Sequence, residues 1–227
     1  MHTRIRATGL RVSLNLLYLG VLAVALPWLI YRRLTTNRYR EGVRSKLFGV
    51  KPRDLPPLPQ PDAAKQTGTK TAGQLEPNKT VWLHGVSVGE VQLLAALHKA
   101  WCQQDPSLRF VVSTTTDSGM ALARKLFPDA SLVYFPFDFT WAIRSTLNAI
   151  QPDLIVLGEL ELWPNLTSIS QERGIPLAVI NGRLSDGSFR NYRRLSRFTQ
   201  PMFSRLSYVG AQTKTYAQRF AQCGTPG

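Results

Sequence analysis

The sequence is poor in the residues that build metal centres and disulfide frameworks. Its 227 residues include two cysteines, Cys102 and Cys223, and three histidines. Two widely separated cysteines form neither a disulfide framework nor a zinc motif, so we interpret both as incidental thiols, typical of a reducing compartment. No zinc-binding or D-x-D motif occurs, and the sequence therefore predicts a site that works without a metal.

Two nucleotide-binding fingerprints are missing as well. No G-x-G-x-x-G stands at the first strand-to-helix turn of the predicted domain, and no P-loop occurs in the chain. An α/β fold here would not by itself imply NAD or ATP, because such folds serve many functions. We accordingly expect no resident cofactor.

What the chain has in abundance is positive charge, concentrated beside its longest apolar run. The net charge is +14, and residues 1–79 hold fourteen basic against four acidic residues. Residues 12–31 form a run of twenty without a charge, and six basic residues follow between 32 and 46. As a helix this run would be about 30 Å long, roughly the thickness of the hydrocarbon layer of a membrane.

The apolar run has three interpretations. Residues 23–25 resemble a cleavage site of a signal peptide, but apolar residues continue past them and the basic cluster opposes translocation. A soluble core helix fits less well, because the run shows no polar face. We predict an uncleaved anchor, spanning or monotopic. The downstream cluster keeps the rest of the chain in the cytoplasm and attracts the anionic inner leaflet.

The chain divides into three segments. Residues 1–50 are the predicted membrane anchor with a basic juxtamembrane segment. Residues 51–79 hold six of the fifteen prolines and lack apolar periodicity, which is typical of a linker. Residues 80–227 are the predicted globular domain.

The globular domain alternates short apolar runs with helical patterns. Predicted strands lie at 81–84, 109–113, 132–135, 154–157, 177–180 and 208–210, and predicted helices at 90–102, 118–127, 141–150 and 163–173. This is the rhythm of βαβ units, and β-branched runs without clean alternation are typical of a sheet covered on both faces. The sequence predicts an α/β, doubly wound parallel sheet with Rossmann-like architecture.

The first strand-to-helix turn, Gly85-Val86-Ser87-Val88-Gly89-Glu90, has two chemical interpretations. As G-x-S-x-G it would be the nucleophile elbow of an α/β-hydrolase, with Ser87 as nucleophile. That chemistry needs a later histidine, and the only histidine after Ser87 is His98, inside the next predicted helix. Read from Ser87 to Glu90, the turn ends in a carboxylate that can serve as a general base, and we favour this interpretation.

Further polar residues follow the other predicted strands. Because the carboxyl ends of parallel strands share one edge of a sheet, we expect them near Glu90. Glu159 and Glu161, two apart, face the same way if the strand continues. A metal on this pair is weakly supported. A basic run with five arginines between 190 and 205 could meet phosphates or form a solvated surface, and no nucleic-acid motif accompanies it. The remaining candidates are Thr115, Thr116, Asn181, Arg183 and Ser185.

Five ordered motifs resemble the 3-deoxy-D-manno-octulosonic acid (Kdo) transferases. They are W-L-H-G-V-S-V-G-E at 82–90, S-T-T-T-D-S-G at 113–119, Y-F-P-F-D at 134–138, E-L-E-L-W-P-N at 159–165, and the segment 175–185. The resemblance covers about residues 80–223 and implies the N-terminal half of a GT-B glycosyltransferase. Leu160 stands where the family usually has threonine.

The resemblance also implies a reaction and roles. Such enzymes transfer Kdo from CMP-Kdo to a lipid A precursor, lipid IVA, at the cytoplasmic face of the inner membrane. Glu90 would be the general base and Glu159 would stabilise the transition state, in an inverting, metal-independent reaction. Ser87, Gly89, Thr115, Thr116, Glu161, Asn181, Arg183 and Ser185 would bind substrate.

The CMP-Kdo domain of the family would lie beyond Gly227. We therefore expect that a further domain or a partner supplies it, and that these residues alone do not transfer Kdo. A non-catalytic, membrane-anchored lipid- or glycan-binding module and the hydrolase remain as alternatives.

Overall fold

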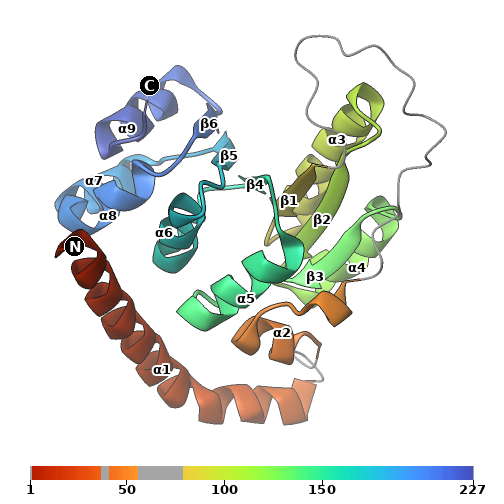
Figure 1. The fold of residues 1–227 in the computed structure, drawn as a ribbon, viewed down its shortest axis with the longest axis horizontal. Coiled ribbons are helices and arrows are strands. Elements are labelled where there is room, and N and C mark those ends of the chain that lie inside the picture. The colour runs from red at the N-terminus through yellow and green to blue at the C-terminus, as the bar shows by residue number, and fades with distance from the viewer. Residues whose placement is uncertain (1, 37–40, 56–78, 227) are drawn as a thin grey trace.

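The computed structural model describes residues 2–36, 41–55 and 79–226 (Figure 1). Its centre is a sheet of six parallel strands in the order β3-β2-β1-β4-β5-β6. The strands are β1 Thr80–His84, β2 Arg109–Thr114, β3 Ser131–Tyr134, β4 Leu154–Leu157, β5 Leu177–Gly182 and β6 Tyr208–Ala211. The predicted α/β class is confirmed, and each strand lies within two residues of its predicted bounds.

Each face of the sheet carries its own hydrophobic core, because successive side chains of a strand point to opposite faces. Trp82 and Ile155 belong to the core beneath α5 (Thr140–Ile150), α6 (Pro164–Glu172), α8 (Ser196–Phe203) and α9 (Lys214–Cys223). Leu83 and Val156 belong to the core beneath α3 (Val88–Gln104) and α4 (Asp117–Leu126). The sheet is therefore doubly wound, as predicted.

Three C-terminal helices were not predicted. Between β5 and β6 the chain forms α7 (Asp186–Arg194) and α8, and α9 follows β6. In α7, Phe189 and Tyr192 lie one turn apart and pack against the core, while Arg190, Arg193 and Arg194 are exposed. The arginine-rich run is thus the outer side of an amphipathic helix, and its charge concealed the helical pattern.

Residues 43–55, which the sequence analysis divided between anchor and linker, pack against the domain. They form α2 (Val43–Phe48) and a 3₁₀ turn (Pro52–Asp54). Val50 is fully buried, and its backbone N–H donates to Thr146 Oγ1 at 3.0 Å. Gly49, with φ at 77°, allows this approach, because a Cβ there would lie 2.2 Å from the carbonyl oxygen of Ala142. The rest of the predicted linker, 56–78, lies outside the described residues.

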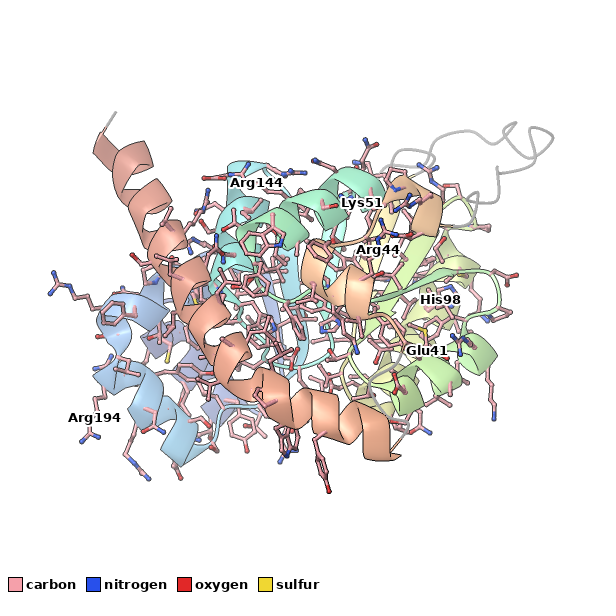
Figure 2. The ribbon with its side chains drawn as sticks, turned by 90° about the horizontal axis from the view of Figure 1, so that it is seen from below. Glu41, Arg44, Lys51, His98, Arg144 and Arg194 are labelled. Carbon is pink, nitrogen blue, oxygen red and sulfur yellow. The ribbon has the colours of Figure 1, made fainter. Side chains whose placement is uncertain are left out.

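The N-terminal helix α1 (His2–Thr36) lies along the domain (Figures 1 and 2). Arg11 Nη2 donates to Ser168 Oγ at 2.6 Å and to Glu172 Oε1 at 2.7 Å. The Asn15 side-chain oxygen accepts the backbone N–H of Thr140 at 3.1 Å. One turn on, Tyr18 Oη donates to Asp138 Oδ2 at 3.2 Å.

The spacing of these contacts places Arg11, Asn15 and Tyr18 on one stripe of the helix. The expectation that the apolar run has no polar face was therefore wrong. The opposite side is apolar and exposed, with Leu16, Leu17 and Val24 between 60% and 83% accessible. Among the described residues, one helix is long and apolar enough to cross a membrane, and its window is Arg11–Trp28.

Candidate functional site

The site is built where the strand order reverses. β1 pairs with β2 on one side and with β4 on the other, so the chain leaves β1 and β4 toward opposite flanks of the sheet. In open parallel sheets this reversal opens a crevice at the carboxyl ends of the strands, and ligands bind there. The predicted site residues lie at this edge, in the loops after β1, β2, β4 and β5, in the first turn of α3 and near the end of β5.

Glu90 lies in the first turn of α3 and closes a capping box. Its carboxylate accepts the backbone N–H of Val86 at 2.9 Å and of Ser87 at 3.1 Å, while Ser87 Oγ accepts the N–H of Glu90 at 3.3 Å. Glu90 is 8% exposed. Each carboxylate oxygen has more than one acceptor site, so capping does not exhaust the group.

Gly158 brings the end of β4 against Glu90. Its N–H donates to the carbonyl oxygen of His84 at 2.8 Å. A Cβ on Gly158 would lie 3.3 Å from both Glu90 Cβ and that carbonyl oxygen, so a side chain there would need its neighbours to shift by a few tenths of an ångström. Glu159 follows directly, one residue beyond this close approach.

Glu161 is held by a buried histidine. His84 Nε2 lies 3.2 Å from Glu161 Oε2, and His84 Nδ1 lies 2.9 Å from Ser113 Oγ. The imidazole is 1% exposed and stacks on Phe135, with ring centres 3.8 Å apart. A second carboxylate therefore stands at the same edge with its orientation fixed from the core.

Glu159 and Arg183 line one shallow pocket. Its volume is about 140 Å³, and Leu160, Ser188 and Tyr192 complete the lining. Arg183 is exposed, which leaves its guanidinium available to an anionic group. The pocket joins the end of β4 to the end of β5 and α7, and Glu90 is not among its lining residues.

The hydroxyl and amide candidates lie at the same edge, but several serve the backbone. Thr116 Oγ1 accepts the N–H of Gly119 as the N-cap of α4 and donates to the carbonyl oxygen of Val86 at 3.0 Å. Ser185 caps α7, accepting the N–H of Ser188 at 3.3 Å. Asn181 has a left-handed backbone, with φ at 57°, and its side-chain oxygen accepts from Gln212. Thr115 is partly exposed beside Thr116, and Gly89 is exposed.

The contacts of the two described histidine rings bear on the hydrolase alternative. His84 is engaged by Ser113 and Glu161. His98 packs edge-on against Phe110, with ring centres 4.5 Å apart, and lies near Cys102 Sγ. Ser87 Oγ instead accepts the backbone N–H of Glu90. Within the described ranges, neither ring is engaged with the Ser87 hydroxyl, which is a helix cap.

The described part of the chain contains no group of three or more His, Cys, Asp or Glu residues arranged to hold a metal ion. Glu159 and Glu161 sit in different surroundings, one in the pocket and one on the imidazole. The chemistry at the crevice is therefore that of carboxylates, an imidazole and a guanidinium.

The sequence matches a family of known proteins. A family model described as 3-deoxy-D-manno-octulosonic-acid transferase (kdotransferase) matches residues 62–227. The chain belongs to this Kdo transferase family. The crevice residues Glu90, Glu159 and Glu161 all lie inside the matched range.

Curated members of the family include 3-deoxy-D-manno-octulosonic acid transferases from three bacteria. The Chlamydia trachomatis serovar D protein is 36% identical over 146 residues, which are 63% of this chain and 34% of that protein. The Chlamydia pneumoniae protein is 30% identical over 205 residues, 89% of this chain and 42% of that protein. The Haemophilus influenzae protein is 33% identical over 151 residues, which are 66% of this chain and 35% of that protein. The chain thus spans between a third and a half of the length of these relatives.

Two residues of the site were missed from sequence. His84 and Ser113 stood inside the motifs at 82–90 and 113–119, but neither was given a role of its own. The available signal was polarity at the ends of two neighbouring apolar strands, since His84 and Ser113 are paired in register. A buried polar residue there needs a partner, which predicts a hydrogen bond.

Proposed function

We propose that the chain is the acceptor-side half of a membrane-bound Kdo transferase that uses CMP-Kdo as donor and a lipid A precursor, lipid IVA, as acceptor in lipopolysaccharide synthesis. The observation that carries the proposal is the position of Glu90, at the reversal of strand order and in van der Waals range of the exit of β4. Family membership supports the transfer of Kdo, and the donor CMP-Kdo and the acceptor lipid IVA belong to the proposal.

In the proposed reaction Glu90 is the general base. A sugar hydroxyl of the acceptor gives its proton to a carboxylate oxygen of Glu90. The hydroxyl oxygen then forms a bond to the anomeric carbon of Kdo, on the face opposite the CMP group. The bond from that carbon to the phosphate oxygen breaks, and CMP leaves with its electrons. A positioned base of this kind contributes typically about 10²–10⁴-fold.

We assign the other crevice residues to substrate binding and charge stabilisation. Glu159 would stabilise the transition state beside Glu90, and Arg183 in the same pocket would meet an anionic group of a substrate. Ser87, Gly89, Thr115, Thr116, Glu161, Asn181 and Ser185 line the edge as substrate contacts. The site is proposed to use neither a metal nor a resident cofactor, and a GT-B partner domain would hold CMP-Kdo.

The chain is also proposed to sit on the cytoplasmic face of the inner membrane, with no role in nucleic-acid binding. The exposed apolar side of α1 supports membrane contact, since its polar stripe is used by the domain. In the view of Figure 2, Arg144 and Arg194 are drawn on opposite sides of α1, and both are exposed, although Arg144 is also paired with Glu172. Exposed basic charge on this side of the domain favours anionic lipid. Because the stripe ties α1 along the domain, a monotopic arrangement in the interface fits better than a spanning one.

The experiment measures transfer of labelled Kdo from CMP-Kdo to lipid IVA. The chain is tested alone and joined to the part of the Haemophilus influenzae relative beyond the matched segment. We expect transfer only by the joined protein, and a loss of about 10²–10⁴-fold for Glu90→Gln. Glutamine has one acceptor oxygen, so this change removes the base and keeps one of the two backbone N–H bonds that Glu90 accepts.

Glu41→Gln is the matched control, because it neutralises an exposed carboxylate that contacts Arg124 and Tyr134. Its transfer rate should equal that of the unchanged joined protein. Near-normal turnover by Glu90→Gln would remove Glu90 as the base. Binding of lipid IVA without transfer by any joined protein would favour a binding module instead.

A further inference from the structure

Four side chains form a line that starts in the core and ends at the crevice. Trp82 Nε1 lies 2.8 Å from Ser113 Oγ, which lies 2.9 Å from His84 Nδ1. His84 Nε2 lies 3.2 Å from Glu161 Oε2. Trp82, Ser113 and His84 are at most 1% exposed, whereas the side chain of Glu161 is 27% exposed.

The donors and acceptors fix the direction of this line. The indole N–H of Trp82 can only donate, so it occupies Ser113 Oγ as acceptor. The hydroxyl hydrogen of Ser113 then has two acceptors, His84 Nδ1 at 2.9 Å and the carbonyl oxygen of Leu83 at 3.4 Å. Nδ1 also lies 3.1 Å from the backbone carbonyl oxygen of Ser113, which could only accept a hydrogen from it. A neutral ring carries one hydrogen, and the carboxylate of Glu161 at Nε2 can only accept. Nε2 therefore carries the hydrogen in the neutral ring, and Nδ1 accepts from the Ser113 hydroxyl.

The imidazole has little freedom to choose another arrangement. Phe135 stacks on its face with the ring planes 18° apart, and strand register places His84 beside Ser113. Rotation of the ring would leave a buried donor or acceptor without a partner, which is unfavourable. The direction of the bonds is therefore set by the core, before any ligand arrives.

We propose that Trp82, Ser113 and His84 form a one-way hydrogen-bond chain that fixes the carboxylate of Glu161 at the crevice as an acceptor for sugar hydroxyl groups. His84 occupies one oxygen of Glu161, and Oε1 is left to the ligand. His84 is thus a positioning residue. The identification of the ligand as a sugar rests on the proposed function, whereas the hydrogen-bond chain is argued from the contacts alone.

Nitrogen NMR of the full chain, labelled in its histidines, tests the hydrogen-bond chain directly. The sequence has three histidines, so the signal lost in His84→Asn identifies His84. We expect a protonated Nε2 and an unprotonated Nδ1. Glu161→Gln should move the Nε2 signal, and Ser113→Ala the Nδ1 signal. A hydrogen on Nδ1 with a bare Nε2 would overturn the proposal.

Binding of lipid IVA to the full-length polypeptide in detergent micelles tests whether the hydrogen-bond chain serves recognition of the ligand. Glu161→Gln and His84→Asn should each weaken binding about tenfold, the order expected for a hydrogen bond to a charged group. The double variant should be no weaker than Glu161→Gln alone, because both act through one carboxylate. His84→Gln is the matched variant, since its amide nitrogen reaches the place of Nε2, and it should keep most of the affinity.

His84 would have only a structural role if His84→Gln and His84→Asn lost the same affinity for lipid IVA. The same conclusion would follow if the losses of affinity were additive in the double variant. Unchanged affinity in Glu161→Gln would overturn the recognition role. Failure of the unchanged chain to bind lipid IVA would instead refute the proposed function and this recognition role together. In that case the NMR measurement would still decide whether the hydrogen-bond chain exists.

Discussion

Glu90 and Asp138 are two buried carboxylates that make similar bonds in different regions. Glu90 is 8% exposed and accepts two backbone N–H groups of its own turn. Asp138 is 5% exposed and accepts the backbone N–H groups of Asn165 and Leu166, both at 2.8 Å, at the start of α6. One carboxylate closes a local turn, and the other joins segments far apart in the sequence.

The comparison shows that the hydrogen-bond donors of a buried carboxylate determine whether it has a structural role or can meet a ligand. Asp138 also accepts the hydroxyl of Tyr18 from α1, so three groups from two helices hold it. Burial raises the pKa of Asp138 to about 7, despite the opposing effect of its hydrogen bonds to Asn165, Leu166 and Tyr18. Glu90 has only local partners at the mouth of a crevice, and it is therefore the group suited to meet a substrate.

The largest effect should come from removing Asp138. Asp138→Ala leaves two buried N–H groups of α6 and the Tyr18 hydroxyl without an acceptor, and we expect a loss of about 3 kcal/mol in the free energy of unfolding. Glu90→Ala should cost about 1 kcal/mol, because it removes one side of a helix cap. Urea unfolding in detergent measures both, and equal losses would erase the distinction between the two carboxylates.

The next prediction concerns pH. The pKa of Asp138 is higher in the folded chain than in the unfolded one, so its contribution to stability is full below about pH 4 and falls as the pH rises toward 7. Between pH 5 and 7 the loss should be on the order of 2 kcal/mol. Asp138→Asn should flatten this part of the stability curve. The same slope in both proteins would assign the pH dependence to other groups.

A smaller change sharpens the role of Glu90. Gly158→Ala places a Cβ 3.3 Å from Glu90 Cβ, which pushes the carboxylate out of position. We expect transfer by the joined protein to fall about tenfold, since small displacements of catalytic groups are costly. Gly187→Ala is the control, because a Cβ there meets no atom within 4 Å. A normal rate in Gly158→Ala would show that the exact placement of Glu90 is unimportant.

The smallest effect belongs to the contact of α1 with Asp138. Tyr18→Phe removes one hydrogen bond, so thermal unfolding should report a loss of about 1 kcal/mol. Tyr208→Phe removes a hydroxyl from a side chain that is 62% exposed and should change stability by less than about 0.5 kcal/mol. If both variants unfold alike, α1 is not fastened through Tyr18.

The sequence allowed the sheet and its functional edge to be predicted, because both depend on short-range patterns. Apolar runs mark strands, and parallel strands bring their carboxyl ends to one side. The Glu161–His84 contact spans 77 positions, and the Tyr18–Asp138 contact spans 120. No local pattern contains such pairs. Asp138 illustrates the limit, because it precedes α5 in the chain and yet caps α6, 27 positions on.

Two features of the fold were not predicted because arginine side chains made the local sequence look like an exposed surface or a membrane flank. The arginines of α7 hid the apolar pair Phe189 and Tyr192, which anchor that helix. Arg11 was interpreted as part of the basic flank of the anchor, yet its side chain is 11% exposed and paired with Glu172. A basic residue beside an apolar run is consistent with a lipid contact or a protein contact, and only the fold decides between them.

The fastening of α1 has a geometric consequence. Asn15 bonds to the first turn of α5, and Tyr18 bonds to the carboxylate that caps α6. The helix α1 is therefore held against α5 and α6, which cover one face of the sheet. If the outer side of α1 rests in a bilayer, the height of Glu90 above the lipid surface is constant. The sugar part of an acceptor whose acyl chains stay in the bilayer must then extend over the same height. The position of α1 would therefore determine which sugar hydroxyl group reaches the base.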